Sequence, residues 1–219
     1  MSSRERILGR VRRALADVHG EDGPVERTYL REHGRRSVGE TVELLAENLA
    51  DYRALVHHCT EAELAAVIGR LVAARGSGAV LVPTGLAPQW LAATDAEQVT
   101  DRAESTPREL DRVGSVVTGC AVAIAETGTI VLDGGPDQGR RRITLVPDHH
   151  ICVVRVPDQV VSSVPQALER LAPTSPLTWI SGPSATSDIE LDRVEGVHGP
   201  RTLEVVLVGG DQPSTAVNS

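Results

Sequence analysis

One carboxylate stands out in the sequence because apolar residues lie on both sides of it. Glu126 separates the run at residues 121–125 from the run at residues 129–132, and Thr127 and Gly128 follow it directly. Glycine allows a close backbone approach, and neighbouring N–H groups in such a turn can hold an anion or polarise a carbonyl. Two interpretations stay open: Glu126 is a catalytic nucleophile or general base, or it is an ion-paired residue of a hairpin turn.

Histidines form a second set of candidates. His149 and His150 open an apolar run after Pro147, so alternation along a strand directs them to opposite faces and argues against a metal pair. His198 lies in a glycine-containing segment before the last apolar run, where an imidazole could reach a cleft or hydrogen-bond the loop backbone. We expect His150 and His198 to contact a ligand.

A polar segment follows one of the last predicted strands. Ser181, Gly182 and Ser184 come directly after this strand and precede Asp188 and Glu190. Because ligands of open α/β sheets bind beyond the carboxyl ends of strands, we expect these five residues to line a pocket. Neither G-x-G-x-x-G nor G-K-[ST] occurs in the chain, so no motif predicts NAD or ATP.

The cysteines and the glycine-rich loop do not indicate a cofactor site. Cys59, Cys120 and Cys152 lie far apart in the sequence and form no C-x-x-C, so we expect reduced thiols and no metal or cluster of the chain's own. Residues 133–140 are rich in Gly and Asp and are interpreted as an exposed, mobile loop. The arginines at 140–142 either bind an anionic partner or are merely solvated.

Composition and charge limit the classes of function. Hydrophobic residues make up 41% of the 219-residue chain and charged residues 24%, which is typical of one main globular domain. The aromatic content is 2%, so the core must be aliphatic, which suits a buried parallel sheet. A formal net charge of -8 disfavours nucleic-acid binding. Without a long apolar run or a signal-peptide pattern, we expect no membrane span and a cytoplasmic location.

Apolar spacing predicts the elements that must position these residues. Helical periodicity is found over residues 2–18, 42–49, 60–75, 89–93, 107–113 and 163–171. Strand-like runs cover residues 54–56, 79–82, 115–118, 121–125, 129–132, 151–156, 177–180 and 203–208. We predict an α/β fold: an open mixed, mainly parallel sheet flanked by helices, with a β-rich insertion. The expected parts are an N-terminal helix and linker (1–38), the α/β domain (39–209) and a disordered tail (210–219).

Several segments resemble the lactate-utilization protein C family, which carries the LUD domain. The matching segments, in order, are Thr118–Gly119, Ala125–Thr129, Pro147–Ile151, Ile180–Ser184, Ser187–Glu190 and Gly196–Arg201. The resemblance implies a sheet related to sugar-phosphate isomerases and CoA transferases. It also implies a place in a multi-subunit system that oxidises L-lactate to pyruvate, beside partners that carry iron–sulfur clusters. The matched positions add Thr118, Gly119, Thr127, Gly128 and Thr129 to the expected ligand-binding residues.

Three functions follow from the motifs and the resemblance. The first is an accessory subunit of the lactate-oxidising system, without a cluster of its own. The second is a stand-alone enzyme that uses Glu126 on a small carboxylate, a phosphosugar or an acyl-CoA thioester, since acyl transfer can pass through a carboxylate anhydride. The third is a ligand-sensing module whose N-terminal helix reports to a partner.

Overall fold

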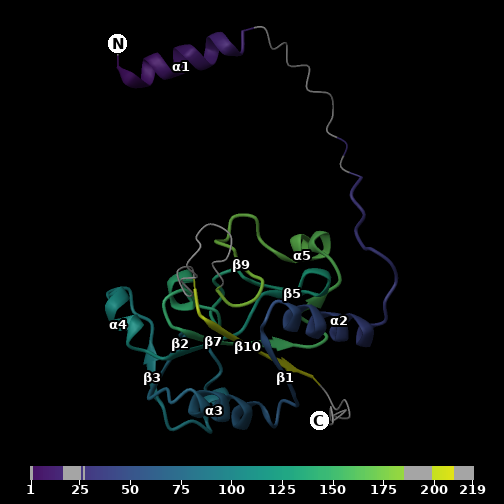
Figure 1. The fold of residues 1–219 in the computed structure, drawn as a ribbon, viewed down its shortest axis with the longest axis vertical. Helices are drawn as coiled ribbons and strands as arrows, with labels where there is room; N and C mark the ends of the chain where they lie inside the picture. Colours follow the sequence, from purple (N-terminus) through teal and green to yellow (C-terminus); the bar gives the residue numbers. More distant parts are fainter. Residues whose placement is uncertain (1, 17–25, 27, 185–198, 210–219) are drawn as a thin grey trace, which may run out of the picture. The chain divides into compact units, whose positions relative to one another are not determined.

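The computed structural model describes residues 2–16, 26, 28–184 and 199–209 (Figure 1). The predicted tail at 210–219 and part of the predicted linker lie outside these residues. The chain divides into two units, Met1–Leu30 and Arg31–Ser219, which are described separately. None of the helices in the described ranges has the length and apolarity needed to cross a membrane.

The first unit contains helix α1 (Ser3–Ala14). Ser2 caps it, because the Ser2 hydroxyl accepts from the Glu5 N–H while the Glu5 carboxylate accepts from the Ser2 N–H at 2.6 Å. No residue of α1 is buried, and the side chains of Ile7, Val11 and Leu15 are 62%, 47% and 57% exposed. The helix therefore presents an aliphatic stripe to solvent.

The second unit is built on a six-stranded sheet in which every strand pair is parallel. Its order is β1 (Leu55–Cys59), β10 (Thr202–Val208), β7 (His149–Arg155), β4 (Ser115–Thr118), β2 (Ala79–Val82) and β3 (Glu97–Thr100). The central strands are buried on both faces, which explains why they are aliphatic runs without polar alternation. The predicted α/β class is confirmed.

Helices cover both faces of this sheet, α3 on one side and α2 on the other (Figure 1). Helix α3 (Leu64–Ala74) and the 3-10 turn η1 (Pro88–Leu91) pack on the face that includes Val117 and Val206. Helix α2 (Val38–Asp51) packs on the opposite face, which includes Val205. Helix α4 (Pro107–Asp111) and the 3-10 turn η3 (Arg141–Thr144) contribute Leu110 and Ile143 to a smaller hydrophobic cluster.

The β-rich insertion forms a second sheet of its own. Its order is β8 (Val160–Val161), β5 (Val122–Ile124), β6 (Thr129–Leu132) and β9 (Thr178–Ile180). This sheet is mixed, because β6 runs antiparallel to β5 and β9 whereas β8 runs parallel to β5. Helix α5 (Val164–Arg170) buries Ala167 against it. The neighbouring strand-like runs at 115–118 and 151–156 belong to the parallel sheet, as β4 and β7.

Candidate functional site

The turn that holds Glu126 is fixed by direct packing against helix α2. The 3-10 turn η2 (Ala125–Thr127) links β5 to β6 and ends at Gly128, whose φ is 53°. A Cβ at Gly128 would lie 2.7 Å from the backbone of Asn48, so only glycine fits without displacing the helix. The Asn48 amide also donates to the Ala125 carbonyl at 2.7 Å.

Both carboxylate oxygens of Glu126 are engaged within the chain. Arg36 Nη1 donates to Oε1 at 3.1 Å, and His33 Nδ1 lies 2.9 Å from Oε2. The Glu126 side chain is 19% exposed, so these contacts are partly shielded from water. Of the two interpretations of Glu126, the ion-paired turn is the one that the geometry favours. The carboxylate anchors the segment that leads into α2.

Other predicted residues gather around the same turn. The hydroxyls of Thr127, Thr129 and Ser181 form a chain in which neighbouring oxygens lie 2.8 Å apart. Gly182 has a φ of 81° and lies so close to the Tyr52 carbonyl that a Cβ there would clash. These contacts tie β6, the end of β9 and α2 together.

His150 and Thr118 form a separate, buried pair. His150 Nε2 lies 2.8 Å from Thr118 Oγ1, and both residues are buried in the face that packs against α2. Burial, and to a smaller degree the nearby charge of His149, lowers the pKa of His150 to about 3. Among the described residues no hydrogen bond or ion pair joins this pair to Glu126. The structure therefore brings His150 and Thr118 together, apart from the Glu126 turn.

The remaining predicted residues fall elsewhere. Gly119 lies at the carboxyl end of β4, and Ser184 donates its N–H to the Pro200 carbonyl at 2.8 Å. Asp188, Glu190 and His198 lie outside the described residues.

The crevice where open α/β sheets usually bind ligands is occupied by the chain itself. Strand β3 lies beside β2 on one side, whereas β7 lies beside β4 on the other, so the chain leaves β2 and β4 in opposite directions. The topological switch point of the sheet therefore lies between β2 and β4. At their carboxyl ends, the N–H groups of Gly85 and Gly119 donate to the consecutive carbonyls of Pro136 and Asp137, both at 2.9 Å. The loop at residues 133–139 thus fills the switch point.

This loop was predicted to be mobile and exposed; Gly134 and Pro136 are exposed, but the chain buries another part of it. Gln138 is buried, and its side-chain oxygen accepts from the Asp133 N–H at 2.7 Å. Beyond the loop, Arg140 makes a two-pronged contact with the buried Asp101 carboxylate at 2.6 Å for each prong, and Arg142 adds a contact at 3.3 Å. These two arginines bind the chain's own carboxylate.

A buried polar network was missed in the sequence. Glu204 is 4% exposed, and its carboxylate lies 2.5 Å from His57 Nε2 and 3.4 Å from His149 Nε2. His149 Nδ1 continues to the Ser115 hydroxyl at 2.8 Å, which lies 2.7 Å from the Ser77 hydroxyl. Burial raises the pKa of Glu204, but contacts with the two histidines outweigh it and lower the pKa to about 2. The network lies on the α3 face, which confirms that His149 and His150 point to opposite faces.

A signal for this network does exist in the sequence. Glu204 interrupts an otherwise apolar strand, and a buried charge there requires partners. Its partners could not be identified, because His57 lies 147 residues away in the chain.

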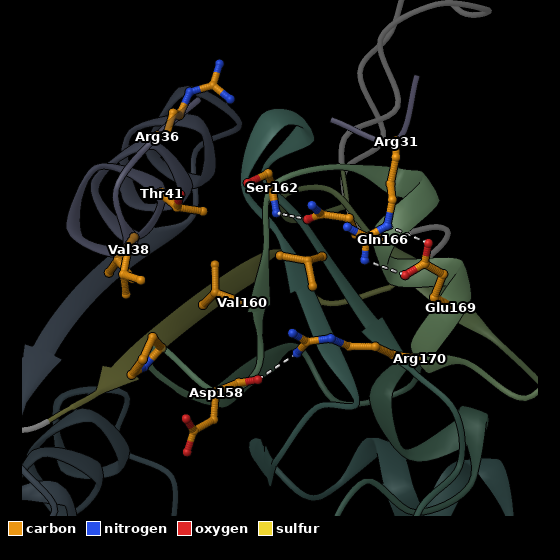
Figure 2. A pocket seen from close by; sticks show the side chains of 13 residues that line it. Arg31, Arg36, Val38, Thr41, Asp158, Val160, Ser162, Gln166, Glu169 and Arg170 are labelled. Atoms are coloured by element: carbon orange, nitrogen blue, oxygen red, sulfur yellow. Dashed lines mark hydrogen bonds and ion pairs between the residues drawn. The ribbon is translucent and has the colours of Figure 1, made fainter. Parts of the chain in front are cut away.

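A groove adjoins the Glu126 turn (Figure 2). It has a volume of about 510 Å³ and is formed by α2, β8 and α5 together with the segment before α2. Three arginines line it: Arg31, Arg36 and Arg170. Arg31 makes a two-pronged contact with Glu169 at 2.7 Å for each prong.

The described residues show no grouping of three or more His, Cys, Asp or Glu side chains that could hold a metal ion. The three cysteines are free thiols, of which Cys120 and Cys152 are buried. A hydrogen bond with the Cys152 thiol, together with burial, raises the pKa of Cys120 well above its ordinary value. This thiol is therefore held protonated in the core.

Comparison with known proteins gives a consistent family. The LUD domain model matches residues 42–208. Lactate utilization protein C of Deinococcus radiodurans is 48% identical over 177 residues, which cover 79% of this chain and 82% of the relative. Lactate utilization protein C of Geobacillus kaustophilus is 34% identical over 170 residues, or 68% of this chain and 70% of the relative.

A solved structure agrees with this match. The crystal structure of a DUF162 family protein from Deinococcus radiodurans superposes with a TM-score of 0.69 at 40% sequence identity. The superposition covers 80% of this chain and 100% of that one.

Proposed function

Because the chain belongs to the LUD domain family, we propose that it acts in lactate utilization, as an accessory subunit of a system that oxidises L-lactate to pyruvate. In this proposal the iron–sulfur clusters reside in partner subunits, and the chain carries no cofactor of its own. The names of its relatives support the role in lactate utilization. The accessory role is inferred from the site.

The observation that carries the accessory role is that both oxygens of the Glu126 carboxylate already have partners within the chain. A carboxylate nucleophile needs an oxygen that can approach the substrate, but Arg36 and His33 engage both oxygens of Glu126. The filled crevice at the switch point supports the same conclusion, because the backbone donors of Gly85 and Gly119 are already used. A stand-alone enzyme based on Glu126 would first have to break both contacts.

Reconstitution tests this proposal directly. Pyruvate formation from L-lactate is measured with an artificial electron acceptor for the purified chain, for the cluster-bearing subunits, and for both together. We expect the chain alone to be inactive and to show no visible absorption, and its addition to raise the rate of the other subunits. Heat-denatured chain serves as the control. Full activity of the chain alone, or no effect of its addition, would contradict the accessory role.

A further inference from the structure

Three side chains of helix α5, those of Gln166, Glu169 and Arg170, line the groove next to strand β8 (Figure 2). Gln166 and Arg170 are four residues apart in this helix, a spacing that places side chains on the same helical face. Val160 of β8 forms an aliphatic floor beside them, and Val38 and Thr41 of α2 form the opposite wall. The groove thus combines hydrogen-bond donors of α5 with the apolar side chains of Val160 and Val38, and Glu169, Asp158 and Arg36 also line it.

Arg170 differs from the other two arginines of the groove. Arg31 is paired with Glu169, and Arg36 is paired with Glu126. Arg170 Nη1 donates to the Asp158 carbonyl at 2.6 Å, which orients the guanidinium without neutralising it. Within residues 28–184 and 199–209 its Nε and Nη2 atoms make no hydrogen bond, and no carboxylate pairs with it. One edge of a positively charged, oriented fork is therefore available.

Gln166 supplies a second oriented donor. Its side-chain oxygen accepts from the Ser162 N–H at 2.9 Å, which fixes the orientation of the amide. The amide Nε2 then carries two N–H groups that make no hydrogen bond to any residue the structure describes. Gln166 can donate to an oxygen atom of a ligand bound beside Arg170.

We propose that this groove binds a short 2-hydroxy or 2-oxo monocarboxylate. The ligand carboxylate would accept from the Nε–Nη2 edge of Arg170, since guanidinium and carboxylate match in a two-pronged contact. The oxygen on C2 would accept from Gln166, and the short alkyl group would lie on Val160. The identity of the ligand rests on the proposed function, from which lactate and pyruvate follow as members of this class. The volume of about 510 Å³ lies within the range of small-molecule sites.

Calorimetric titration of the purified full chain tests the site without any partner subunit. L-lactate is the ligand, and L-lactamide is the matched probe because it keeps the shape and hydroxyl but lacks the charge. We expect L-lactate to bind with a dissociation constant on the order of 1 mM, and L-lactamide at least about tenfold more weakly. Arg170→Gln should weaken L-lactate binding by at least about tenfold.

The control variant is Arg112→Gln, which makes the same charge change at an exposed residue after α4 and should leave binding unchanged. Because Arg170 is exposed at the end of α5, Arg170→Gln should fold, and circular dichroism checks this. Absence of saturable L-lactate binding, or equal binding by Arg170→Gln and wild type, would overturn the proposal. Either result would leave the accessory role standing, because reconstitution measures that role independently.

Discussion

Replacing Glu204 with Gln is expected to lower the free energy of unfolding at pH 7 by about 3 kcal/mol. The variant keeps the size of the side chain but removes the negative charge that His57 and His149 contact at 2.5 and 3.4 Å. The contacts lower the pKa of Glu204 to about 2, although burial alone would raise it. Since the folded pKa lies below the ordinary glutamate value of 4.5, this contribution is present above pH 4.5 and is lost as the pH falls towards 2.

Urea unfolding at pH 7 measures this effect. The matched control is Glu97→Gln, which makes the same change on the exposed edge strand β3 and should alter stability by less than about 0.5 kcal/mol. If Glu204→Gln is as stable as Glu97→Gln, the buried network does not stabilise the fold.

His150 is expected to make the protein lose stability on mild acidification. Burial holds the pKa of His150 at about 3, below the ordinary histidine value of 6.5. Below pH 6.5 the unfolded chain therefore binds a proton that the folded chain excludes, so stability falls as the pH decreases. Between pH 7.5 and 5 this one residue should cost the wild type about 2 kcal/mol, and His150→Gln should remove that loss.

Unfolding in urea at several pH values between 7.5 and 5 checks this expectation. That range lies above pH 4.5, where the contribution of Glu204 begins to decline. His58→Gln, which removes an exposed histidine from β1, is the matched variant and should follow the wild type throughout. Parallel pH curves for wild type and His150→Gln would show that His150 is not held neutral by the fold.

Most of the architecture could be predicted from the sequence, because buried strands and amphipathic helices leave clear patterns. The strand at 79–82 was found as an apolar run, and the helix within 60–75 was found from its spacing. Strand β3 was missed, because its residues Glu97–Thr100 are mostly exposed at the edge of the sheet and show no apolar alternation.

The candidate site could be predicted only in part. The hydroxyls of three expected ligand-binding residues, Thr127, Thr129 and Ser181, do come together beside the Glu126 turn. The partners of Glu126 could not be found, because Arg36 and His33 lie 90 and 93 residues away and in a segment interpreted as a linker. The contacts of the loop at 133–139 could not be predicted for a different reason. Its contacts with Gly85 and Gly119 are made by backbone carbonyls, which side-chain composition does not encode.

The most direct test of the accessory role is the rate of L-lactate oxidation by the reconstituted system containing Glu126→Gln. Glutamine keeps an oxygen that can accept from Arg36 and a polar group beside His33, but it cannot act as a carboxylate nucleophile or base. Glu43→Gln, on the exposed face of α2, is the matched control. We expect the Glu126→Gln system to keep its rate within about twofold of the wild type. A fall of about 10³-fold or more, with the chain still folded and assembled, would show that Glu126 performs chemistry.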